Sequence, residues 1–232
     1  MSEPVLWQTL TWEDVAALRD SGITMAILPV GATEQHGPHL PLRTDTDIAV
    51  ALYRRLGAAR TDVLIAPPLA YGSSGEHADF AGTLSIGGAA LESLLVELGR
   101  SADAFAGLVF VSAHGGNAGA LRAAVSLLRS ESRRVRAWFL PADTAPRADA
   151  HAGYTETSVM LALSPSAVRI GSAEAGATDP LGAIMPVLAA AGVASVSPNG
   201  VLGDPSGASA SEGRRVIDDW ASKLLDDLDG WP

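Results

Sequence analysis

The stretch from 31 to 46, GATEQHGPHLPLRTDT, concentrates acids and histidines within a short segment of the 232-residue chain. Glu34 and His36 are two residues apart, so in an extended backbone their side chains leave on the same side, while Gln35 points away. The glycines and prolines of this stretch exclude a long helix and favour an irregular, fixed loop. A carboxylate and an imidazole that converge are ligands for zinc, manganese or iron. The sequence therefore predicts a metal site in this loop.

Asp45 comes at the end of the same loop, directly before TDIAVALYRRL, whose apolar spacing is typical of a helix. Two interpretations of Asp45 are open. It can be an N-cap that satisfies the free amides of the first helical turn. Alternatively, its two carboxylate oxygens can bridge two metal ions. The acids and histidines beside it favour the metal interpretation.

A second set of polar residues follows GLVFVSA, the clearest buried strand of the chain, which ends on HGGNAG with His114. In open parallel sheets, sites lie outside the carboxyl ends of strands, and the loop at 31–46 also follows an apolar strand, ITMAILPV. The two sets are therefore predicted to meet. Asn117, in the same turn, is a candidate for orienting a ligand or binding the substrate carbonyl. HGGNAG also has a weak likeness to a phosphate-binding turn, but it is not GxGxxG and no Walker sequence occurs.

Three further groups are candidate site residues. Glu76 and His77 lie in SSGEHADFAGTLSIG, a glycine-rich loop whose length suits a pocket wall, although an ordinary surface loop is the alternative. His151 precedes a predicted helix. Glu156 falls in the first turn of that helix, where a carboxylate either stabilises the helix dipole or reaches into a site.

Helical patterns alternate with apolar strands along the chain, which predicts an α/β fold, and we expect a single domain over 1–232. Helices are expected at 11–22, 89–104, 181–191 and 212–228. With 47% hydrophobic and 18% charged residues the chain can bury a large core. The N-terminus lacks the pattern of a signal peptide, and no apolar run approaches the roughly 20 residues that span a bilayer. We therefore expect a cytoplasmic protein without a membrane partner.

Charge and composition exclude several classes of protein. The net charge is −10, from 26 acids against 16 basic residues without a basic run, which argues against binding nucleic acid. The absence of cysteine excludes disulfides, thiolate metal sites and cysteine nucleophiles. No GxSxG motif occurs, so a covalent serine mechanism has little support.

Four segments, TEQHGPHLPLRTDT, EHADFAGTLSIG, HGGN and HAGYTETS, resemble in this order the motifs of the creatininase (creatinine amidohydrolase) family. The resemblance covers nearly the whole chain. It implies a three-layer α/β/α sandwich with a mostly parallel central sheet, two divalent metal ions per chain and a homo-oligomer, often a hexamer. Carried over by position, it implies Glu34 and His114 on one ion, His36 on the other, Asp45 bridging both, and His151 as the acid/base.

The chain departs from the family at Gly116, where creatininases carry a glutamate ligand two residues after the strand-end histidine. Glu156 is the candidate for the missing ligand, and we include it with His151 among the predicted catalytic residues. PRADA, at 146–150, stands where creatininases have a pocket tryptophan and acids. These departures argue against creatinine as the substrate.

HGGN, together with APPLAYGSSGEH and VSPNGVLGDPSGASASEGRR, most resembles the subgroup that matures mycofactocin. In that subgroup the enzyme is a peptidase that removes the C-terminal Val-Tyr dipeptide of a modified precursor peptide, which is thus the implied partner. Glu76, His77 and Asn117 are then predicted to contact the substrate. One alternative is a hydrolase of creatinine, small cyclic amides or formamides. Another, from a different class, is a non-catalytic module that binds a phosphorylated ligand.

Overall fold

A computed structural model describes residues 5–141 and 149–231, and its centre is a parallel sheet. The four strands are β1 (Met25–Val30), β2 (Val63–Ile65), β3 (Gly107–Ser112) and β4 (Val135–Phe139), in the order β2-β1-β3-β4. Met25 pairs with Val63 on one side and Gly107 on the other. The strand β2 is short, and Pro67 and Pro68, which follow it after Ala66, have no N–H to donate to a ladder.

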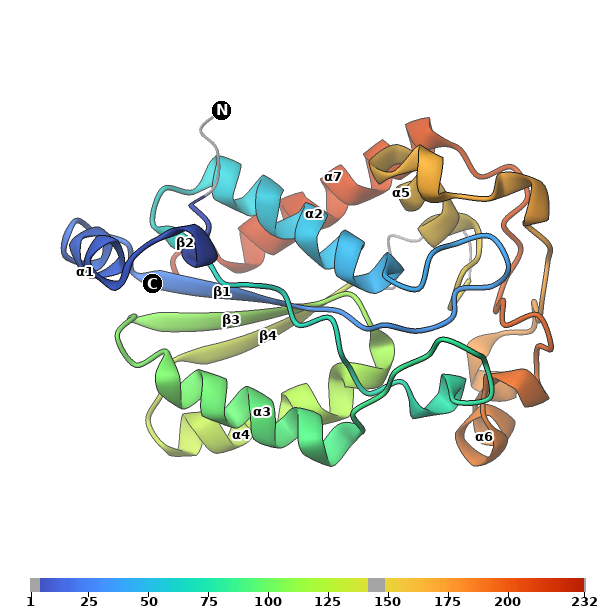
Figure 1. Cartoon of the computed structure of the whole chain (residues 1–232), viewed down its shortest axis with the longest axis horizontal. Coiled ribbons are helices and arrows are strands. Elements are labelled where there is room, and N and C mark those ends of the chain that lie inside the picture. The colour runs from blue at the N-terminus through green and yellow to red at the C-terminus, as the bar shows by residue number, and fades with distance from the viewer. Residues whose placement is uncertain (1–4, 142–148, 232) are drawn as a thin grey trace.

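Two layers of helices cover this sheet (Figure 1). On one face lie α2 (Thr44–Ala59), α5 (Tyr154–Leu163) and α7 (Ala210–Asp227), and on the other α3 (Gly88–Ser101) and α4 (Ala118–Ser130). Along β1, Met25 and Ile27 pack into one core while Ala26, Leu28 and Val30 pack into the other. Because both faces are buried, the strand is apolar throughout. The predicted three-layer α/β/α fold is confirmed.

Shorter elements lie around the sandwich. The helix α1 (Trp12–Asp20) starts with a capping box that Thr11 and Asp14 form. The helix α6 (Leu181–Ala191) lies beyond the carboxyl ends of the strands (Figure 1). Single 3₁₀ turns occur at η1 (Trp7–Thr9), η2 (Gly75–His77), η3 (Gly115–Asn117), η5 (Pro165–Ala167), η6 (Ile170–Ser172) and η7 (Val193–Ser195). Within the described ranges, every helix is too short or too polar to span a bilayer.

The chain reverses its winding direction between β1 and β3. From β1 it passes through α2 to β2 on one side, and from β3 it passes through α4 to β4 on the other. Such a reversal opens a crevice at the carboxyl ends of the two central strands. The loop after β1 and the turn after β3 therefore meet there, as the sequence predicts.

Candidate metal centre

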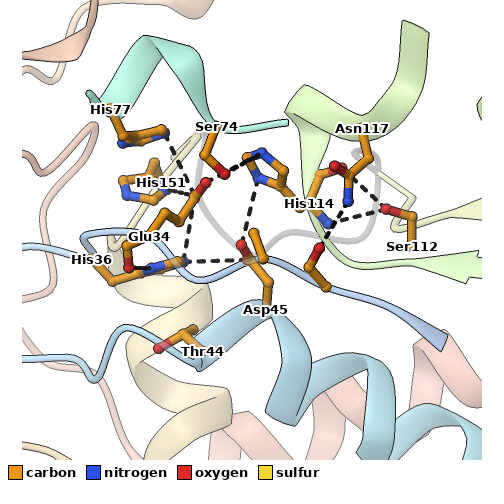
Figure 2. A network of polar contacts seen from close by, with 12 residues as sticks. Glu34, His36, Thr44, Asp45, Ser74, His77, Ser112, His114, Asn117 and His151 are labelled. Atoms are coloured by element: carbon orange, nitrogen blue, oxygen red, sulfur yellow. Dashed lines mark hydrogen bonds and ion pairs between the residues drawn. The ribbon is translucent and has the colours of Figure 1, made fainter. Parts of the chain in front are cut away.

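Glu34 lies in the loop after β1 and is fully buried. Among the described residues, neither of its carboxylate oxygens has a hydrogen-bond partner. Its Oε2 lies 3.2 Å from Nε2 of His114, and its Oε1 lies between 3.5 and 4.0 Å from ring nitrogens of three more histidines, His77, His151 and His36 (Figure 2). A buried carboxylate without hydrogen bonds is costly unless a cation is paired with it. Glu34 therefore has the environment of a metal ligand.

Asp45 does not cap α2, so the N-cap interpretation is wrong. The helix begins at Thr44, the cap position is Arg43, and Asp45 lies inside the first turn with its side chain buried. Its Oδ1 lies 3.2 Å from Nε2 of His36, and its Oδ2 lies 3.5 Å from Nδ1 of His114. Each oxygen thus faces a different imidazole, which is the arrangement that a bridging carboxylate needs.

Two sets of potential ligands share Asp45. In each set, one ligand atom per residue lies within 4.8 Å of the others. The first is Glu34, Asp45 and His114, and the second is His36, Asp45 and Glu156. A third set, Glu34, His36 and His151, overlaps with both. Nitrogen and oxygen donors without sulfur suit zinc, manganese and iron, so the residues fit the ions that the sequence predicts.

Glu156 reaches the site from the first turn of α5. Its Oε2 lies 3.9 Å from Nε2 of His36 and accepts a hydrogen bond of 2.5 Å from the backbone N–H of Ala152. Its carboxylate therefore bonds to the backbone just before the helix and also extends into the metal-ligand cluster, by which we mean Glu34, His36, Asp45, His114, His151 and Glu156. Burial raises the pKa of its carboxyl to about 7, although the charge of His36 opposes this shift.

Gly116 leaves no room for the ligand that creatininases carry at this place. A Cβ atom there would lie 2.3 Å from the carbonyl oxygen of Ser73, 2.4 Å from Nε2 of His114 and 2.5 Å from Oε1 of Glu76. The turn is thus built for glycine, and a further carboxylate ligand must come from another element. Glu156, which shares a set of potential ligands with His36 and Asp45, is such a carboxylate.

Gln35 is a functional residue that the sequence analysis missed. It was expected to point away from the site, yet it is buried beneath the loop at 197–203. Its Oε1 accepts from the N–H of Gly37 at 2.8 Å, and its Nε2 donates to the carbonyl of Gly200 at 3.0 Å. Because a covering loop is supplied from a distant part of the chain, an alternation rule for an isolated strand cannot predict this burial.

Gln35 also contacts two histidines, His77 through its side chain and His151 through its backbone oxygen, and these contacts indicate which ring nitrogen of each carries the proton. Its Nε2 lies 2.8 Å from Nδ1 of His77, which must accept, so the His77 proton is assigned to Nε2. Nε2 of His151 lies 2.8 Å from the backbone oxygen of Gln35 and 3.0 Å from Nε2 of its side chain; we assign the His151 proton to Nε2, as donor to the shorter contact. The free Nδ1 of His151 then faces Glu34 at 3.7 Å.

The other predicted residues divide between the cavity and its surroundings. A cavity of about 570 Å³ opens beside the cluster, and Glu76 and His77 line it. Asn117 lies outside that lining. Its Nδ2 donates to the carbonyl of Gly31 at 3.0 Å and its Oδ1 accepts from the N–H of Ser73 at 2.9 Å. Both ends of the Asn117 side-chain amide are thus bonded to the backbone of neighbouring loops. This geometry does not favour the predicted contact with substrate.

Two histidines of the cluster have strongly raised pKa values. Burial alone would lower the pKa of His36, but the charge and hydrogen bond of Asp45 raise it to about 10. Burial also opposes the shift at His114, where Glu34 raises the pKa to about 10. The Glu34 carboxyl has a lowered pKa because these imidazoles outweigh its burial. In the metal-free fold, protons on His36 and His114 therefore balance the carboxylates.

We expect metal binding at about pH 8 to release about two protons per chain. His36 and His114, with pKa values of about 10, are protonated in the metal-free fold, and ligation requires neutral imidazole. The affinity for the metal should then rise about tenfold per pH unit for each proton released, and it should level off above the pKa values of the two histidines. Calorimetry of Mn²⁺ binding in buffers of different ionisation enthalpy measures the proton count. Binding without proton release would contradict this electrostatic arrangement.

Comparison with known proteins agrees with this geometry. The family profile described as Creatininase: Creatinine amidohydrolase matches residues 8–228. A relative from Mycolicibacterium smegmatis, named mycofactocin precursor peptide peptidase, is 51% identical over 217 residues, covering 91% of this chain and 87% of the relative.

Solved structures give the same relationship. A crystal structure of creatinine amidohydrolase (creatininase) aligns with a TM-score of 0.83 at 26% identity, covering 98% of this chain and 97% of the other. A structure named creatininase Mn aligns with a TM-score of 0.82 at 25% identity, covering 97% of this chain and 98% of the other. The chain therefore belongs to the creatininase family and is a metal-dependent hydrolase of amide C–N bonds.

Proposed function

We propose that this chain is a dinuclear metallopeptidase. Glu34 and His114 hold one divalent cation, His36 and Glu156 hold a second, and Asp45 bridges the two. The observation that carries this assignment is the position of Asp45, whose two oxygens face His36 and His114 separately and which both sets of ligands share. Zinc, iron and manganese all fit these donors.

The chemistry follows from the ligands and from His151. When bound, two such cations lower the pKa of a shared water to about 7 and polarise the amide carbonyl. Burial lowers the pKa of His151 well below its usual value, so this ring starts neutral. Its Nδ1 would accept a proton from the attacking water as general base and return it to the leaving amine nitrogen as the C–N bond breaks. Glu156 bonds to the N–H next to His151 and so also positions this ring.

The substrate that we propose is the modified precursor peptide of mycofactocin, from which the enzyme releases the C-terminal Val-Tyr dipeptide. The name of the relative that is 51% identical over most of both chains supports this choice. The cavity of about 570 Å³ also supports it, because a small cyclic amide would fill only part of that space.

Mass spectrometry of the metal-loaded protein with the modified precursor peptide tests the proposal. We expect loss of the Val-Tyr mass from the peptide and no turnover of creatinine in a parallel reaction. A truncated peptide should lose turnover as well as affinity, because remote contacts help to position the scissile amide. Creatinine turnover beside an untouched peptide would instead favour the small-amide alternative.

The phosphate-binding alternative has no support from the cavity. The described residues that line it include no lysine or arginine, and they include the acids Asp45, Glu76, Asp149, Glu156 and Asp179. A phosphorylated ligand would be repelled by this charge. A homo-oligomer and a cytoplasmic location stay predictions from the resemblance and the sequence.

A further inference from the structure

The helix α6 has a composition that its surroundings do not explain. Its sequence, LGAIMPVLAAA, is apolar on every side, yet none of its residues is buried. Leu181, Met185 and Val187 are 42%, 42% and 49% exposed. An entirely apolar helix is normally covered, and an exposed apolar surface of this kind marks a binding site.

One face of α6 forms a wall of the cavity beside the candidate metal centre. Leu181, Ile184, Met185 and Leu188 line the cavity. Their spacing of three, four and seven residues places them on a single stripe of the helix. Val187 lies off this stripe and does not line the cavity.

The end of α6 is packed directly against the segment that carries two cavity residues. The helix stops at Gly192, with φ of 76°. A Cβ atom at Gly192 would lie 3.0 Å from the backbone oxygen of Glu76, so glycine permits this close approach. The apolar stripe is thereby held at a fixed place relative to Glu76 and His77.

The cavity has two chemically different parts. Asp45, His114, His151 and Glu156 belong to the candidate metal centre, whereas the α6 stripe, Leu140, Leu202 and Trp220 supply apolar side chains to the same lining. The side chains of the stripe are all aliphatic or thioether groups, so the stripe itself suits an uncharged, apolar group. The stripe and the candidate metal centre thus line one cavity.

We propose that the stripe of α6 is a specificity subsite that binds the apolar side chains next to the scissile amide of a peptide. This inference rests on the proposed function and deepens it. It assigns the selection of substrate to Leu181, Ile184, Met185 and Leu188. The occupant is an apolar or aromatic peptide segment, not a second copy of the chain.

Met185 and Val187 provide a matched pair for the test, because they are similarly exposed on the same helix and only Met185 lines the cavity. Met185→Asp should lower kcat/KM for a peptide ending in Val-Tyr by about ten- to hundredfold, the range expected for an apolar pocket. Metal content should be unchanged. Val187→Asp should stay within about twofold of the unsubstituted enzyme.

A charge exchange makes the test independent of small folding defects. A peptide ending in Lys-Tyr should be a poor substrate of the unsubstituted enzyme and a better one of Met185→Asp, since the new carboxylate pairs with lysine. Equal losses in Met185→Asp and Val187→Asp, with a changed oligomeric state on gel filtration, would show that another copy covers α6. Unchanged selectivity in Met185→Asp would also overturn the subsite.

Binding of free Val-Tyr, measured by calorimetry, separates this proposal from the proposed function. Binding to the unsubstituted protein that Met185→Asp weakens by about tenfold, without cleavage of any peptide, would support the subsite and reject the peptidase. Cleavage of the Val-Tyr peptide at equal rates by both proteins would support the peptidase and reject the subsite.

Discussion

Replacing Asp45 by alanine is expected to abolish hydrolysis and to lower metal content more than any other single ligand substitution. Its two oxygens face His36 and His114 at 3.2 and 3.5 Å, so one substitution removes a ligand from both proposed ions. Elemental analysis of the purified chain, beside an activity assay, measures both effects. We expect about two ions per chain before the substitution and a near-complete loss after it.

Asp47 supplies the control for this substitution. It lies in the same first turn of α2, but its carboxylate pairs with Arg43 at 2.8 Å near the surface. Asp47→Ala should therefore retain metal and activity. If Asp45→Ala retained both ions, Asp45 would not bridge them and the proposal would be wrong. A loss of stability with normal metal content would show instead that Asp45 serves only the fold.

His151→Ala is expected to lose on the order of 10²- to 10⁴-fold in rate while metal content stays near normal, the usual contribution of general acid–base catalysis. The hydrogen bond from Nε2 of His151 to the backbone oxygen of Gln35 orients the ring and leaves Nδ1 free. Single-turnover kinetics together with elemental analysis separate the rate from the metal content.

The same ring also belongs to the potential ligand set of Glu34, His36 and His151, so the metal measurement is decisive. If metal is lost with the imidazole, His151 is a ligand and the acid/base assignment is wrong. His39→Ala is the matched control. His39 is buried, and burial lowers its pKa to about 4, but it bonds to Thr157 outside the cluster. Its removal should leave the rate per folded molecule nearly unchanged.

The sequence alone was sufficient for the α/β class, most element positions and the residues that gather in the crevice. Strands such as β1 are buried on both faces and are therefore continuous apolar runs that can be recognised locally. The cap at Thr11 is likewise a local signal, because the two residues that form it are three apart. His114 and Glu34 could be expected to meet because both follow the carboxyl ends of parallel strands.

Only the tertiary structure decided what several of these side chains do. Whether Asp45 caps a helix or enters a site depends on where α2 begins relative to His36 and His114. The burial of Gln35 depends on a loop more than 160 residues further along, which contacts it through Gly200. The wall formed by α6 depends on packing in which Gly192 lies close to the backbone of Glu76, which is distant in the sequence. Local patterns specify elements through their periodicity, whereas the convergence of particular atoms is a product of long-range packing, which one sequence does not display.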